Sequence, residues 1–89
     1  IASNPALHRN LEFFMEPRAD YAGPTQSQLF VASGTEDDPR FREPAVTWMN
    51  HWREQPGAWQ RRFVDLPGHS HMSAPPAAFR QGLRWLFGM

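Results

Sequence analysis

Two short segments of this 89-residue chain hold the residue types from which hydrolytic enzymes build an acid and a base. His69 and His71 follow one apolar run, and three consecutive acids follow another. The acids are Glu36, Asp37 and Asp38. A carboxylate that accepts the proton of one imidazole nitrogen fixes the tautomer of the ring, and the other nitrogen can then take a proton from a serine hydroxyl. The two segments therefore predict two of the three parts of a catalytic triad.

The apolar runs before the acids and before the histidines predict two β-strands. Residues 29–32 (LFVA) form a continuous apolar run inside a strand predicted over 28–33, a pattern typical of a strand covered on both faces. A second strand is predicted over 59–66. Its two arginines, Arg61 and Arg62, indicate that its first half is exposed or near an edge of the sheet.

A helix between the two strands makes this unit a βαβ motif. Residues 43–44 (EP) predict its start, because an acid and a proline are favoured in the first helical turn, and residues 56–57 (PG) end it near Gln55. Strands joined in this way run parallel, and their carboxyl ends open at the same edge of the sheet. Adjacent strands lie about 4.8 Å apart. We therefore expect Asp37 to reach the ring of His71.

Helices are also predicted near both ends of the chain. The first is expected over 6–15, with Asn4 as its N-cap and Pro5 at the first helical position, and a polar connection over 16–27 follows it. The last helix starts at residues 75–76 (PP), and an apolar stripe along it is expected to pack on the sheet. Phe79, Leu83 and Leu86 form this stripe, which Ala78, Gly82 and Trp85 widen.

The composition excludes several classes of function. Nine basic and nine acidic residues balance, so no broad positive field attracts nucleic acid or an anionic membrane. The longest apolar runs are far shorter than the roughly 20 residues of a membrane-crossing helix. The absence of cysteine excludes disulfides and thiol catalysis and leaves the cellular compartment open. The length fits one small domain or part of a larger one.

Three segments of the chain together resemble one family of α/β-hydrolases. They are residues 29–37 (LFVASGTED), 66–73 (LPGHSHMS) and 79–87 (FRQGLRWLF). The family includes esterase D, ferric-siderophore (enterochelin-type) esterases and feruloyl or acetyl-xylan esterases, and the three segments are similar to its carboxyl-terminal third. The opening residues 1–7 are similar to the family's segment after the strand that follows the nucleophile.

This resemblance implies a fold, an activity and a pair of site residues. The fold is the C-terminal part of an α/β-hydrolase domain over residues 1–89, a parallel βαβ unit with a final packing helix. The activity is hydrolysis of a small-molecule carboxylic ester, with no metal or organic cofactor. His71 matches the general base in the family's G-x-x-H turn, and Asp37 matches the acid in its G-x-x-D turn. Glu36, beside Asp37, is the alternative acid.

The serine of the family, which lies in a G-x-S-x-G turn, has no match in these residues. We therefore expect the nucleophile and the leading strands to belong to the remainder of the hydrolase domain. These 89 residues alone are then expected to be catalytically inert. The sequence determines neither the acyl and alcohol groups of the substrate nor the oligomeric state.

Two other interpretations of the same residues stay open. The chain could be a small α/β binding module without catalysis. It could also be a metal-dependent hydrolase, because His69, His71 and Asp37 together would supply three ligands of a type that catalytic zinc accepts.

Overall fold

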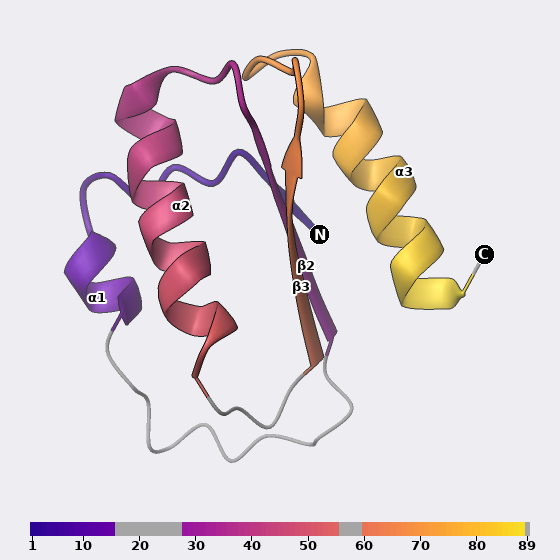
Figure 1. Ribbon diagram of the computed structural model, residues 1–89, viewed down its shortest axis with the longest axis horizontal. Helices are drawn as coiled ribbons and strands as arrows, with labels where there is room; N and C mark the ends of the chain where they lie inside the picture. Colours follow the sequence, from indigo (N-terminus) through magenta and orange to yellow (C-terminus); the bar gives the residue numbers. More distant parts are fainter. Residues whose placement is uncertain (16–27, 56–59, 89) are drawn as a thin grey trace.

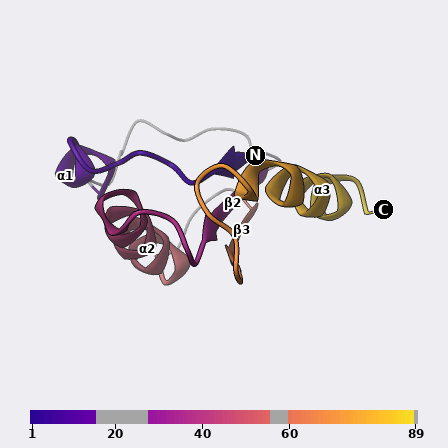
Figure 2. The same ribbon diagram turned by 90° about the horizontal axis from the view of Figure 1, so that it is seen from above.

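Three parallel strands form one sheet, and helices lie against both of its faces (Figure 1). The computed structural model describes residues 1–15, 28–55 and 60–88. The strands are β1 (Ala2–Ser3), β2 (Gln28–Gly34) and β3 (Gln60–Leu66), in that order across the sheet. The helices are α1 (Leu11–Met15), α2 (Pro39–Arg53) and α3 (Ala74–Phe87). Seen from above, α2 and α3 lie on opposite sides of the sheet, and α1 lies beside α2 (Figure 2).

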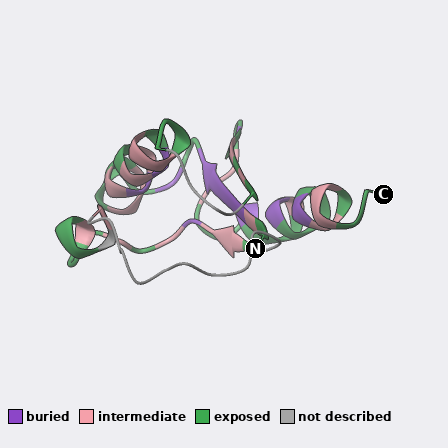
Figure 3. Cartoon of the chain, turned by 90° about the horizontal axis from the view of Figure 1, so that it is seen from below, coloured by how far each residue is buried: buried purple, intermediate pink, exposed green. Residues whose placement is uncertain are grey.

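The central strand β2 is buried along most of its length (Figure 3). Its pairing with β3 runs from Gln28 opposite Gln60 to Gly34 opposite Leu66, so the two strands end side by side. The parallel βαβ unit predicted from the sequence is therefore confirmed, and so is the cover on both faces of its first strand. β3 lies at an edge of the sheet, as the arginine pair at its start indicated.

Helix α2 begins at Pro39, earlier in the chain than the predicted start at Pro44. Asp38 is its N-cap, since the Asp38 carboxylate accepts a hydrogen bond from the backbone N–H of Arg40 at 2.8 Å. Pro44 lies inside the helix, where it lacks the N–H that would bond to the carbonyl four residues earlier. The predicted start was wrong because an Asp-Pro pair can begin a helix as readily as it interrupts one.

The N-terminal segment differs most from its prediction. Of the helix expected over 6–15, only the residues of α1 are helical. The short strand β1 lies before it, where no strand was expected. Asn4 does not cap a helix: its backbone has a φ of 47°, and its N–H donates to the carbonyl of Ala32 at 2.8 Å. A two-residue strand is too short for a periodic pattern, so it is recognisable only from its partner β2.

Helix α3 packs on the sheet through its smallest side chains. Ala78 and Gly82 are buried, whereas Phe79, which was expected to face the sheet, is 57 % exposed. A β-carbon on Gly82 would lie 2.7 Å from Cδ1 of Ile1, so the helix approaches the N-terminal strand closely. The predicted final packing helix is confirmed, but the prediction that Phe79 faces the sheet was wrong. Close approach favours the small side chains of the helix over the large ones.

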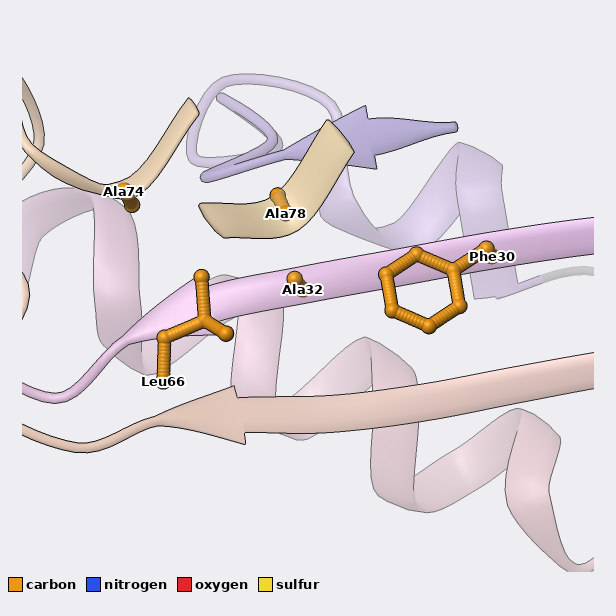
Figure 4. Packing of buried hydrophobic residues seen from close by; sticks show 5 residues of the cluster. All are labelled: Phe30, Ala32, Leu66, Ala74 and Ala78. Carbon is orange, nitrogen blue, oxygen red and sulfur yellow. The ribbon is translucent and has the colours of Figure 1, made fainter. Parts of the chain in front are cut away.

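The core on the α3 side of the sheet combines β2, β3 and α3 (Figure 4). Its buried members are Phe30, Ala32, Leu66, Ala74 and Ala78. Trp85 packs against this cluster, with its ring centroid 6.2 Å from that of Phe30. Successive side chains of a strand point to opposite faces, so Val31 faces α2, where Ala45 and Met49 are buried.

None of the described helices has the length and apolar character of a membrane-spanning helix. The polar connection predicted over 16–27 lies outside the described residues, as does the first residue of the strand predicted over 59–66.

Candidate active site

His71 and Asp37 meet at the edge of the sheet where β2 and β3 end. Nδ1 of His71 lies 3.0 Å from Oδ1 of Asp37, although the residues are 34 positions apart in the chain. Asp37 belongs to residues 34–37, here called the acid turn, and His71 belongs to residues 68–73, here called the histidine loop. The two segments run side by side at the top of Figure 1. The expected proximity of these two side chains is therefore confirmed.

Two hydrogen bonds donated by backbone N–H groups join the acid turn to the histidine loop. The N–H of Glu36 donates to the carbonyl of His69 at 2.9 Å, and the N–H of Gly68 donates to the hydroxyl of Thr35 at 2.9 Å. Within the acid turn, the N–H of Asp37 donates to the carbonyl of Gly34 at 3.1 Å. The carboxylate and the imidazole are thus presented by two turns that support each other.

The carboxylate of Asp37 is buried, with only 1 % of its side chain exposed. Its Oδ1 also accepts a hydrogen bond from the backbone N–H of Asp38 at 2.8 Å, which fixes the orientation of the carboxylate toward His71. Oδ2 is buried and has no hydrogen-bond donor among the described residues. Glu36, the alternative acid, is exposed, so the geometry favours Asp37 over Glu36.

The ring of His71 is held on one side and open on another. An ionised carboxylate can only accept hydrogen bonds, so the bond to Asp37 requires the proton to be on Nδ1 of His71. In the neutral ring, Nε2 is then an acceptor, and no described residue is hydrogen-bonded to it. The side chain is 48 % exposed, which leaves room for a reacting group.

The imidazole of His71 also makes an aromatic contact, which was not predicted from the sequence. The ring of Phe41 lies with its centroid 5.1 Å from that of His71, at an interplanar angle of 35°. His8 meets the same phenyl ring edge-on at 5.1 Å, and the guanidinium of Arg40 lies 4.6 Å from its centroid. Phe41 reaches this position because α2 begins directly after the acid turn, a start that the sequence reasoning placed too late.

His69 does not share the site with His71. Its Nδ1 lies 3.1 Å from the carbonyl of Ser73 and 3.2 Å from the hydroxyl of the same residue, so it contributes to the shape of the histidine loop. Within residues 1–15, 28–55 and 60–88, no group of three His, Cys, Asp or Glu side chains is arranged to bind a metal ion. The zinc set of His69, His71 and Asp37 is therefore not assembled.

The serines of the histidine loop are hydrogen-bonded to each other, and neither is hydrogen-bonded to the imidazole of His71. The hydroxyl of Ser73 accepts a hydrogen bond from the N–H of Ser70 at 2.8 Å, and the two hydroxyls lie 3.3 Å apart. Across the part of the chain that the structure describes, no serine hydroxyl is hydrogen-bonded to the ring of His71. The site thus contains an acid and a base without an adjacent nucleophile among the described residues.

Compared with protein-family models, with curated proteins and with solved structures, the chain has no match in any of the three. The chemistry assigned to this site therefore rests on the geometry of its own residues.

Proposed function

We propose that this chain supplies the acid and base of a carboxylic-ester hydrolase of the serine type, with the nucleophilic serine contributed by a segment outside these 89 residues. One observation carries the proposal: the 3.0 Å contact between a buried carboxylate and Nδ1 of a half-exposed imidazole, at the carboxyl ends of two parallel strands. With Nδ1 bound to Asp37, Nε2 of His71 is the ring nitrogen left for proton transfer, and the carboxyl ends of parallel strands are where ligands of such sheets bind. The resemblance to the esterase family agrees with this assignment.

The proposed reaction uses His71 twice. First, Nε2 of His71 takes the proton of the serine hydroxyl while the serine oxygen attacks the ester carbonyl carbon, and the C=O π electrons move to the carbonyl oxygen. The tetrahedral intermediate collapses, the bond to the alcohol oxygen breaks, and His71 returns the proton to that oxygen. Water then releases the acyl group by the same two steps. Asp37 holds the ring and stabilises its positive charge while the proton is on it.

The binding-module interpretation has its own supporting observation. The sheet is covered by α2 on one face and α3 on the other, an arrangement that a small self-standing domain also requires. In that case the contact between His71 and Asp37 would only stabilise the loop at the end of the sheet. The two proposals differ in what happens to ester hydrolysis when the pair is removed.

The experiment uses the longer protein that this proposal requires, in which a segment bearing the nucleophile is joined to these residues. A fluorophosphonate probe is expected to label one serine in that segment, within a G-x-S-x-G turn. For p-nitrophenyl acetate, Asp37→Asn is expected to lower kcat by about 10⁴-fold, and His71→Ala is expected to lower it by up to about 10⁶-fold. His69→Ala is the matched control, expected to lower it by less than about tenfold, as for a single group outside the proton transfer.

Three results would count against the proposal. Full activity in both His71→Ala and Asp37→Asn would remove the pair from the mechanism. Stoichiometric zinc that is lost in His69→Ala would favour the metal-dependent alternative. Saturable, His71-dependent ester hydrolysis by the 89 residues alone would show that the nucleophile lies within them.

A further inference from the structure

We propose that Asn4 is a positioning residue that holds the acid turn and the histidine loop at one fixed separation. The inference rests on the proposed function, since it concerns the pair that would transfer the protons. Asn4 lies just after β1 and is 4 % exposed. Its side-chain amide is bound to both segments, one at each end.

The oxygen of the amide is bound to the acid turn. Oδ1 of Asn4 accepts a hydrogen bond from the N–H of Gly34 at 2.8 Å, and this contact is buried. The carbonyl of Gly34 in turn accepts the N–H of Asp37. Asn4 therefore holds the first residue of the turn that presents the carboxylate.

The nitrogen of the amide is bound to the histidine loop. Nδ2 of Asn4 donates to the carbonyl of His71 at 3.1 Å and to the carbonyl of Ser70 at 3.4 Å. The first of these carbonyls belongs to the residue whose ring contacts Asp37. One amide thus connects the backbone that carries the base, 67 positions further along the chain, to the backbone that carries the acid, 30 positions further along.

The backbone of Asn4 is adapted to this task. Its φ of 47° is the only positive value at a non-glycine position among the described residues. Asparagine adopts this left-handed conformation more readily than most residues, and its side chain offers a donor and an acceptor on one short planar group. Aspartate has the same shape without the donor, and glycine tolerates the backbone without the amide. These two residues separate the contributions of the side chain.

The test measures the hydrogen bond between His71 and Asp37 directly, by long-range ¹H–¹⁵N NMR of the imidazole in the 89-residue protein. Asn4→Asp keeps the acceptor for Gly34 but turns an oxygen toward the carbonyl of His71, and Asn4→Gly removes both contacts. In each variant we expect the Nδ1 proton of His71 to exchange with water about tenfold faster, as expected for the loss of about one net hydrogen bond.

A matched control makes the same chemical change at the opposite end of β2. Gln28 donates its amide hydrogen to the side chain of Gln60 at 2.9 Å on the surface, so Gln28→Glu also replaces an amide donor by a carboxylate oxygen. This variant is expected to leave the His71 resonances unchanged. Amide resonances along β2 and β3 report whether each variant keeps the fold.

Every result bears on the proposal. Faster exchange at Nδ1 in the two Asn4 variants, with the sheet resonances preserved, supports positioning by Asn4. Unchanged exchange in both folded variants overturns it, and so does unfolding of both, because Asn4 would then be a determinant of the fold as a whole. The readout involves no ester hydrolysis, so an inactive protein does not affect it.

Discussion

Gly34 and His69 lie so close together that no side chain fits between them. A β-carbon on Gly34 would lie 2.2 Å from the carbonyl oxygen of His69 and 2.8 Å from its carbonyl carbon. Both of these atoms belong to the backbone of the histidine loop, which cannot rotate away as a side chain can. The end of β2 is therefore in direct contact with the loop that carries the proposed base.

Replacing Gly34 by alanine is expected to displace the histidine loop. The overpacking should lower the free energy of unfolding by about 3 kcal/mol, near the upper end of the usual range for an added methyl group. Urea unfolding measures this change, and NMR of the His71 ring reports the separation from Asp37. Gly68→Ala is the control: it has open space around the new atom but a φ of +75°, so we expect about 1–2 kcal/mol and an intact pair. Equal behaviour of the two variants would argue against the contact.

The face of α3 that meets the sheet gives a second prediction. Phe30 is buried beneath this helix at 1 % exposure, so Phe30→Ala should lower the free energy of unfolding by about 3–5 kcal/mol. A small domain is typically stable by about 5–15 kcal/mol, so this variant is expected to lose a large share of its stability at 25 °C. Phe79→Ala makes the same truncation on the exposed face of α3 and should change the free energy by about 0.5 kcal/mol or less. Thermal unfolding of both variants distinguishes the observed helix orientation from the one the sequence predicted.

The order and direction of the βαβ unit were predictable from the sequence because they depend on strong local signals. The apolar run marks β2, and the turn residues Gly34 and Gly68 mark where the two strands end. The helix between the strands then predicts that they pair in parallel. The face of α3 was not predictable in this way. A hydrophobic stripe shows which residues are apolar, but Ala78 and Gly82 face the sheet because of the distance between helix and strands, which local sequence does not contain.

The site was predictable in part for the same reason. Asp37 and His71 each follow a strand, so topology alone brings them to one edge of the sheet. Asn4 and Phe41 were missed as parts of the site, since their roles depend on β1 and on the start of α2. No strand was expected at β1, and the start of α2 was placed too late, because Asn4-Pro5 and Asp38-Pro39 each fit two different local structures.

The contact between Phe41 and His71 predicts how the imidazole is held. Phe41→Ala should remove the ring-current shift that the phenyl ring causes at the His71 protons. The imidazole should also become more mobile, since an aromatic pair contributes about 0.5–1.5 kcal/mol beyond the area it buries. Proton NMR of the His71 ring measures this shift. Phe87→Ala, at an exposed position near the end of α3, is the control and should leave the His71 spectrum unchanged. A His71 spectrum that is the same in Phe41→Ala and in the unsubstituted protein would contradict a role for this contact.

The ion pair between Arg42 and Asp65 is expected to add little to stability on its own. Their charged groups lie 2.9 Å apart, but 56 % of the Asp65 side chain is exposed, so water and salt screen the attraction. A double-mutant cycle with alanine at both positions should give a coupling energy of about 0.2–1 kcal/mol that falls as salt is raised. Arg42→Ala alone should lower the free energy of unfolding more than Asp65→Ala does, because Arg42 also donates a hydrogen bond to the carbonyl of Ser33 in β2 at 3.2 Å. Equal losses from the two single variants would mean that the bond to Ser33 contributes nothing measurable, and that Arg42 connects α2 to the sheet only through Asp65.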